Sequence, residues 1–254
     1  MLKFPTNHMR PTKLGKKAAD YLRKEILEGR IKPGQNLPSE NDLMKSFGIS
    51  RPTLREAIRI LESLGLVVVY RGKKGGAEVR LPTIAVTAAN AAIYLQSQQT
   101  TLYDLHEART CIEPTLVVLL AGKVKKKDLK ELRGLLDRAE EATTDTEKYA
   151  RVITDYHSRL FALLGNHFLD LISSVMHSVM EPLVAAQIAD YRDTDRRKNL
   201  LENIAAQRQI LDLMEAGNFE QAGEFCRQNL MRLGRVLIKT GGGGKLVDSQ
   251  VEHF

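Results

Sequence analysis

The sequence predicts a mainly α-helical protein, in which an N-terminal winged helix-turn-helix precedes an all-helical antiparallel bundle. In the first third, short helical patterns are followed by two β-rich runs that flank a glycine-rich turn. From about residue 84 to residue 240, apolar residues recur at helical spacing without strand-like alternation. The charge divides the same way, because residues 1–82 carry a net charge of +9 and residues 83–254 a net charge of −2. A localised basic excess is typical of a nucleic-acid-binding surface.

Each N-terminal element has its own signal. Residues 12–29 have the apolar spacing of an amphipathic helix, and Gly29 ends it. Ser39 and Ser50 are helix N-cap residues, so they predict a second and a third helix on either side of a turn at residues 47–49. Gly65 stops the third helix, and residues 66–70 and 77–81 form strands around a hairpin tip.

The remainder is predicted to be helical up to residue 240. Short connections such as Gly165-Asn166 and Gly217-Asn218 separate the helices and favour a bundle. The expected helices span residues 84–98, 101–121, 126–142, 146–164, 167–188, 195–216 and 218–239. The expected domains are a flexible N-terminus (1–11), a winged helix-turn-helix DNA-binding domain (12–82), a helical effector-binding and dimerisation domain (83–240) and a flexible tail (241–254).

The third predicted helix has one apolar face, and Arg51, Arg55 and Arg59 are spaced four residues apart on the opposite side. A recognition helix presents its N-terminal residues to base edges, which favours Ser50, Arg51, Thr53 and Arg55 as base readers. We expect phosphate contacts from the remaining basic residues, because such contacts add affinity without sequence information. The complete expected DNA-binding set is Ser39, Ser50, Arg51, Thr53, Arg55, Arg59, Arg71, Gly72, Lys73 and Lys74.

Residues 18–82 resemble the N-terminal domain of the GntR family of bacterial transcription regulators. The resemblance is carried by residues 31–34 (IKPG), 37–40 (LPSE), 47–51 (FGISR) and 53–57 (TLREA), and by the glycine-rich wing. It implies a homodimer on a short palindromic operator in double-stranded DNA. One departure is Asn41, which stands where family members often carry Arg.

The second domain resembles the FCD effector domain of the FadR-type branch, through Arg109-x3-Glu113-Pro114, Tyr156-His157 and the Gly-Asn pairs. Periodicity places polar groups from four helices inside apolar stripes, and burying such groups is costly unless they have partners. The polar groups predict a cavity that holds a small organic effector, a carboxylate or an acyl-CoA-like molecule; core residues that satisfy one another are the alternative. The expected effector-binding residues are Arg109, Tyr156, His157, Gln207 and Asn229.

Many FCD domains hold a metal with an Asp, a His four residues later and two further His. At those positions this chain has Ile153, His157, Gln207 and Asn229, so one ligand of four is retained. Amides are poor ligands for Zn²⁺ and similar ions, which prefer His, Cys or carboxylate. The resemblance therefore implies a degenerate site, and we expect an effector held without metal. His106 and His177 are weaker candidates, expected at a surface or a helix edge.

The sequence favours a ligand-responsive regulator, a repressor, over two alternatives. One is a ligand-independent architectural DNA-binding protein. The other is an enzyme with an accessory DNA-binding head, which is weak because Gly241–Lys245 lacks the Walker pattern and no nucleophile elbow occurs. With two cysteines and no expected signal or membrane-spanning segment, we expect a cytoplasmic protein that has no membrane partner and is not an enzyme.

Overall fold

The structure is a computed structural model that describes residues 13–70, 72, 76–189, 193–239, 244 and 246–247, without the side chains of residues 193–195 and 239. The chain divides into two compact units, residues 1–86 and residues 87–254. The expected flexible N-terminus, 1–11, lies outside the described residues, as do Arg71, Lys73 and Lys74 of the expected wing.

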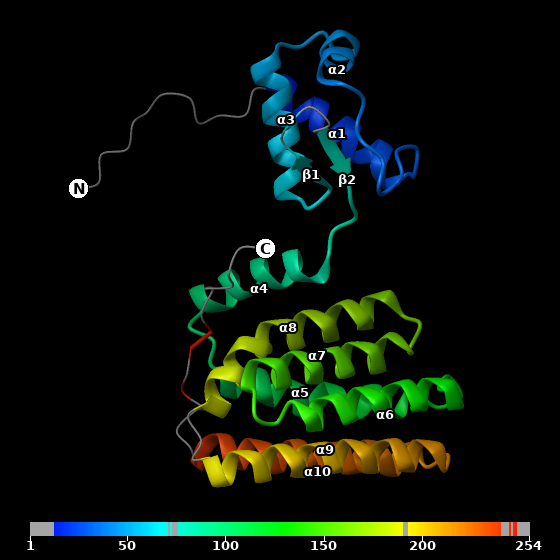
Figure 1. The fold of residues 1–254 in the computed structure, drawn as a ribbon, viewed down its shortest axis with the longest axis vertical. Helices are drawn as coiled ribbons and strands as arrows, with labels where there is room; N and C mark the ends of the chain where they lie inside the picture. The colour runs from blue at the N-terminus through cyan, green and yellow to red at the C-terminus, as the bar shows by residue number, and fades with distance from the viewer. Residues whose placement is uncertain are drawn as a thin grey trace, which may run out of the picture. The chain divides into compact units, whose positions relative to one another are not determined.

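The described residues of the first unit form helices α1, α2 and α3 and a two-stranded antiparallel hairpin (Figure 1). Val67 pairs with Val79 and Tyr70 pairs with Gly76. A bridge from Asn36 to Glu78 ties the α1–α2 connection to the hairpin. The bounds are α1 Lys13–Leu27, α2 Glu40–Phe47, α3 Arg51–Ser63, β1 Val67–Tyr70 and β2 Gly76–Val79.

The two expected N-cap serines behave differently. The Ser39 hydroxyl accepts a hydrogen bond from the Asp42 backbone N–H at 3.2 Å, which satisfies one unpaired amide of the first turn of α2. Ser50 precedes α3 but makes no such bond, and its hydroxyl instead lies 2.9 Å from the Thr53 hydroxyl. Gly48 closes α2 at φ +63°, a left-handed conformation that glycine adopts without strain.

The apolar face of α3 packs on α1 and forms the core of this unit. Leu54, Ala57 and Leu61 are fully buried, as the helical spacing predicts. Leu64 follows at the same helical spacing but is 41% exposed, at the end of the helix. Because the core takes this face, the opposite face of α3 with its arginines remains exposed to solvent.

The second unit is a bundle of long antiparallel helices stacked in pairs (Figure 1). Helix α10 packs along α5 and α9, α6 packs on α7 and α9, and α7 packs on α8. Together with the shorter α4, these confirm the predicted mainly helical fold. The bounds are α4 Ile84–Ser97, α5 Leu102–Val118, α6 Lys126–Glu141, α7 Thr146–Ala162, α8 His167–Ala189, α9 Asp193–Glu215 and α10 Phe219–Lys239.

A proline and a glycine allow α5 and α10 to approach closely. Pro114 lies inside α5 and has no N–H, so it cannot donate the helical hydrogen bond to the Thr110 carbonyl one turn earlier. The Thr110 carbonyl instead accepts a hydrogen bond from the Arg227 side chain of α10 at 3.4 Å. On the facing side, a Cβ on Gly223 would lie 2.9 Å from the Pro114 carbonyl oxygen and 2.6 Å from Val118. The chain needs glycine here because any side chain would force the two helices apart.

Part of the expected C-terminal tail docks on the bundle. The Val247 N–H donates to the Thr100 carbonyl at 2.9 Å, and Leu246 forms a bridge with Thr101. Val247 is 1% exposed and packs in a cluster with Leu102 and Leu237. Residues 246–247 thus extend the apolar packing around the start of α5.

Helix α8 is long and apolar enough to cross a membrane by length and composition, with a mean hydropathy of 1.3 over its most apolar window. In the bundle, it packs against α7 and buries Met176, Val179, Met180 and Leu183. Packing inside the bundle therefore accounts for the apolar residues of α8.

Candidate functional site

Two regions contain the expected site residues, one in each unit. In the first unit, an open groove of about 870 Å³ lies between α3, the start of α2 and the hairpin. Ser39, Arg51, Arg55, Arg59 and Gly72 all line it. Ser50 and Thr53 lie at the start of α3 but are not among the lining residues.

The three arginines of α3 are all exposed. Arg51 lies 3.5 Å from the Glu40 carboxylate, with both side chains largely in solvent. An exposed pair of this kind contributes little to stability, so Arg51 can leave Glu40 at small cost. The groove therefore presents a stripe of guanidinium groups beside the hairpin, as a winged helix-turn-helix needs for a DNA groove and its phosphates.

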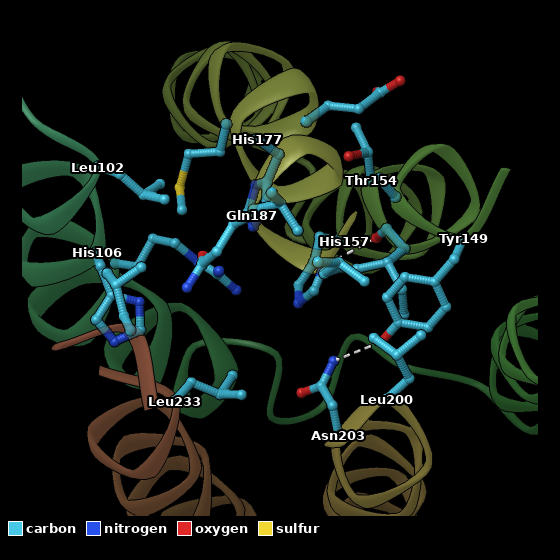
Figure 2. Close-up of a pocket in the computed structure, with 18 of the residues that line it drawn as sticks. Leu102, His106, Tyr149, Thr154, His157, His177, Gln187, Leu200, Asn203 and Leu233 are labelled. Carbon is cyan, nitrogen blue, oxygen red and sulfur yellow. Dashed lines mark hydrogen bonds between the residues drawn. The ribbon is translucent and has the colours of Figure 1, made fainter. Parts of the chain in front are cut away.

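In the second unit, a cavity of about 120 Å³ lies within the bundle, among α5, α7, α8, α9 and α10. Arg109 and His157 of the expected effector-binding set line it, and His157 is labelled in Figure 2. Tyr156, Gln207 and Asn229 are buried but are not among the lining residues.

A chain of hydrogen bonds forms one wall of the cavity. The Asn203 amide donates to the Tyr149 hydroxyl at 3.1 Å, drawn dashed in Figure 2. The Asn229 side-chain amide donates to the Asn203 side-chain oxygen at 3.2 Å, and Arg232 donates to the Asn229 side-chain oxygen. Burial raises the pKa of Tyr149 to about 12, so the phenol stays protonated. Asn229 therefore orients a lining residue rather than lining the cavity itself.

The Arg109 guanidinium at the cavity is not an unpaired charge, because it forms an ion pair with Glu113 one turn later on α5. Arg109 Nε lies 2.5 Å from Glu113 Oε1, and the two side chains are 11% and 2% exposed. Burial alone would raise the pKa of Glu113, but Arg109 and His177 outweigh burial and hold that pKa well below its usual range. Glu113 is therefore a carboxylate, and its charge is compensated by Arg109.

His177 and His106 are buried, so the expectation of a surface or helix-edge position was wrong for both. They are 4% and 7% exposed, because α8 and α5 place these positions on faces that other helices cover. His177 Nε2 lies 3.0 Å from Glu113 Oε1, whereas His106 Nε2 lies 2.7 Å from the Leu230 carbonyl oxygen. Burial, followed by the nearby Arg109 charge, lowers the pKa of His106.

Glu113, His157 and His177 bring three donor atoms within 4.8 Å of one another. The His157 and His177 rings are stacked, with centroids 4.5 Å apart and planes 13° apart. Glu113 was not among the expected site residues, and His177 was only a weaker candidate. The available signals were the i, i+4 pairing of Arg109 with Glu113 and a single histidine inside the apolar run of α8.

The metal ligand set implied by the FCD resemblance does not fit this chain. Ile153 has no donor, and Gln207 and Asn229 offer amides. Glu113 and His177 nevertheless supply donor atoms of the kind that metal ions prefer, and these atoms lie close to His157.

Comparison with known proteins agrees with this two-part organisation. Residues 14–76 match the family described as bacterial regulatory proteins, gntR family, and residues 104–232 match the FCD domain. A solved structure described as Streptococcus agalactiae GntR superposes with a TM-score of 0.65 at 22% identity, covering 87% of this chain and 99% of that one. This likeness shows a shared fold.

Curated relatives are named as transcriptional regulators. The HTH-type transcriptional repressor NanR of Cronobacter sakazakii is 27% identical over 70% of this chain and 67% of its own length. The uncharacterized HTH-type transcriptional regulator YcbG of Bacillus subtilis is 29% identical over 61% of this chain and 63% of its own. The Uxu operon regulator of Haemophilus influenzae is 28% identical over 58% of this chain and 53% of its own.

These matches cover both halves of the molecule, and the relatives are DNA-binding regulators rather than enzymes. The groove in the first unit and the cavity in the second lie within the two matched segments. The chain therefore belongs to the GntR family of bacterial transcription regulators and carries an FCD effector-binding domain.

Proposed function

We propose that the protein is a cytoplasmic, homodimeric repressor that reads a palindromic operator and responds to a small polar carboxylate in the bundle cavity. The observation that supports operator reading is the groove of the first unit, where Arg51, Arg55 and Arg59 lie exposed beside the hairpin. Arginine donates two parallel hydrogen bonds to guanine O6 and N7, which makes it the commonest specific base reader. Two such heads on a dimer would read two half-sites.

The size of the cavity narrows the class of effector. Ligand cavities for drug-sized molecules measure about 300–1,000 Å³, whereas this cavity measures about 120 Å³. A volume of this size suits a molecule of a few heavy atoms and excludes a buried acyl-CoA thioester. The lining includes Tyr149, Thr154, Asn199 and Asn203, whose hydroxyl and amide groups suit a polar ligand.

Response to the effector follows from where the cavity lies. It is lined by side chains from five helices, so a ligand that binds one arrangement of those helices better than another shifts the population toward it. In a dimer, such a shift changes the distance between the two DNA-binding heads. Because the two half-sites of an operator are a fixed distance apart, effector binding would then change the affinity of the dimer for its operator.

The operator is tested by selecting bound duplexes from random DNA and measuring affinity by fluorescence anisotropy. We expect an inverted repeat, two protein chains per duplex, and weaker binding by both Arg51→Ala and Arg55→Ala. Unchanged affinity in both variants would refute the assignment of α3 as the recognition helix.

The effector is tested by a thermal-shift screen of small carboxylic acids, with acyl-CoA thioesters as the contrasting class. We expect small acids to raise the melting temperature and change operator affinity. A folded protein that binds its operator but responds to neither class would instead be a ligand-independent DNA-binding protein.

A further inference from the structure

Around Glu113, one ring nitrogen of His177 and one of His157 lack a matching hydrogen-bond partner among the described side chains. His177 Nδ1 lies 2.8 Å from the Ser173 carbonyl oxygen, which can only accept, so Nδ1 carries the proton. His177 Nε2 lies 3.0 Å from Glu113 Oε1, and the Glu113 carboxylate, which is held in an ion pair with Arg109, also accepts only. A neutral imidazole has one N–H and cannot donate to both acceptors.

His157 repeats this arrangement. Its Nδ1 lies 2.9 Å from the Ile153 carbonyl oxygen and donates to it, which leaves Nε2 as a bare lone pair. That atom is buried without a hydrogen-bond partner among the described residues, and it lies 3.8 Å from Glu113 Oε2.

A second proton on His177 would satisfy the contact with Glu113 but would leave His157 Nε2 without a partner. One divalent ion among the three side chains would satisfy both histidines. Ligands about 2.1 Å from a tetrahedral ion lie about 3.4 Å from one another. Each histidine faces a different oxygen of Glu113, with His177 Nε2 3.0 Å from Oε1 and His157 Nε2 3.8 Å from Oε2, and both distances are close to that separation.

From this geometry we propose that Glu113, His157 and His177 bind a divalent first-row transition metal ion. This ligand set differs from the one that the FCD resemblance implies at positions 153, 157, 207 and 229, with which it shares His157 alone. Two imidazoles and one carboxylate match Zn²⁺, Mn²⁺, Fe²⁺ and similar ions. Both histidines carry the outer hydrogen bond to a backbone carbonyl that metal-ligating histidines commonly make.

The surroundings of the three ligands support the assignment. His157 and His177 also line the cavity, so an ion bound to them would border it (Figure 2). Arg109 holds Glu113 Oε1 at 2.5 Å but lies 3.4 Å from Oε2, which leaves Oε2 the freer oxygen. Because Arg109 neutralises Glu113, a bound divalent ion would give the cavity a net positive charge, which suits an anionic ligand.

The test uses the full-length protein after removal of metal with a chelator. Zn²⁺ is titrated by calorimetry, and Co²⁺ is added separately while its visible absorption bands are recorded. We expect one ion per chain and Co²⁺ bands typical of nitrogen and oxygen ligands. Neither readout involves DNA or an effector, so failure here leaves the proposed regulatory function intact, and the reverse also holds.

Variants separate this site from other locations for a bound ion. His157→Gln and His177→Gln should each weaken Zn²⁺ binding by more than about 100-fold, beyond the roughly 10- to 100-fold typical of losing an outer hydrogen-bond partner. His106→Gln is the matched control, because it removes a buried histidine of the same cavity whose Nε2 is bonded to a backbone carbonyl. It should leave the affinity unchanged, as should Gln207→Leu and Asn229→Leu.

Circular dichroism identifies any variant that fails to fold, and having two histidine variants keeps the test decisive if one is lost. Glu113→Gln is a third test, with the Co²⁺ bands as the readout. The proposal is wrong if the folded wild-type protein takes up no Zn²⁺ or Co²⁺. It is equally wrong if folded His157→Gln and His177→Gln bind them as tightly as wild type.

Discussion

The two halves of the molecule place their functional residues in opposite ways. In the first unit, the groove residues Ser39, Arg51, Arg55 and Arg59 come from one short stretch, and the three arginines are exposed on a single helix. In the second unit, Glu113, His157 and His177 come from three helices, the first and the last are 64 positions apart in the sequence, and all three are buried. A surface site can follow from helix periodicity alone, whereas a bundle interior depends on which helices pack together.

The largest effect is expected in the bundle, from Arg109→Met. Removing Arg109 leaves the buried Glu113 carboxylate without its charge partner, which should cost about 3–5 kcal/mol in the free energy of unfolding. Urea denaturation followed by circular dichroism measures the change. The double variant Arg109→Met/Glu113→Leu should recover much of the loss, because it removes both charges. A single variant as stable as wild type would contradict the buried ion pair.

The next effect is expected in the DNA-binding head, from Arg55→Ala. Losing a bidentate base contact should cost about 1–3 kcal/mol of operator affinity, or roughly 5- to 150-fold. The loss should be confined to one base pair of each half-site, so that changing this base pair weakens wild type but not the variant. Anisotropy on a set of single-base operator variants measures the effect.

Arg59→Ala provides the comparison on the same helix. A phosphate contact should weaken binding to all duplexes equally and lower the dependence of log K on log salt by about 1. If Arg59→Ala instead changes base preference and Arg55→Ala does not, the division between base readers and phosphate contacts is reversed.

A smaller effect distinguishes the two serines that precede helices in the head. Ser39→Ala removes a side-chain cap on α2 and should cost about 0.5–2 kcal/mol. Ser50→Ala should cost less, because Ser50 bonds to the Thr53 hydroxyl and not to a backbone amide. Hydrogen exchange of the α2 and α3 amides measures both, and equal protection losses would contradict the difference in capping.

The smallest effect concerns pH and His106 in the bundle. The pKa of His106 in the folded protein is lowered from 6.5, so below that pH the unfolded chain takes up a proton that the folded protein does not. The associated stability is fully present above pH 6.5 and falls as the pH decreases. Denaturation of wild type and His106→Gln between pH 8 and pH 5 should show a shallower decline for the variant. Parallel curves would mean that His106 keeps its ordinary pKa.

Much of the fold could be predicted because its signals are local. Glycine commonly ends a helix because it adopts positive φ values without strain. The structure has positive φ at all four glycines that were expected to end helices or lie in the turns after them, Gly48, Gly65, Gly165 and Gly217. The apolar spacing of α3 placed Leu54, Ala57 and Leu61 in the core. The predicted end of α5 was less accurate, at residue 121 rather than Val118, because no glycine or proline marks it until Gly122.

The cavity could be predicted only in part. Periodicity put Arg109 and His157 inside apolar stripes, where they are found, but it also put Gln207 and Asn229 with them. A helical wheel shows that a residue faces the interior without showing which neighbours it meets. His177 was misplaced for the same reason, since the apolar run of α8 hid which of its faces α5 and α7 cover.

The sequence by itself determined the two-part architecture, the family and the basic face of α3, because turn residues, apolar periodicity and charge all act over a few neighbouring positions. Only the tertiary structure decided that Arg109 is neutralised by Glu113 and that the carboxylate lies beside the two stacked histidines. The physical reason is that hydrogen bonding and ion pairing are short-ranged in space but not in sequence. They are fixed when α5, α7 and α8 pack against one another.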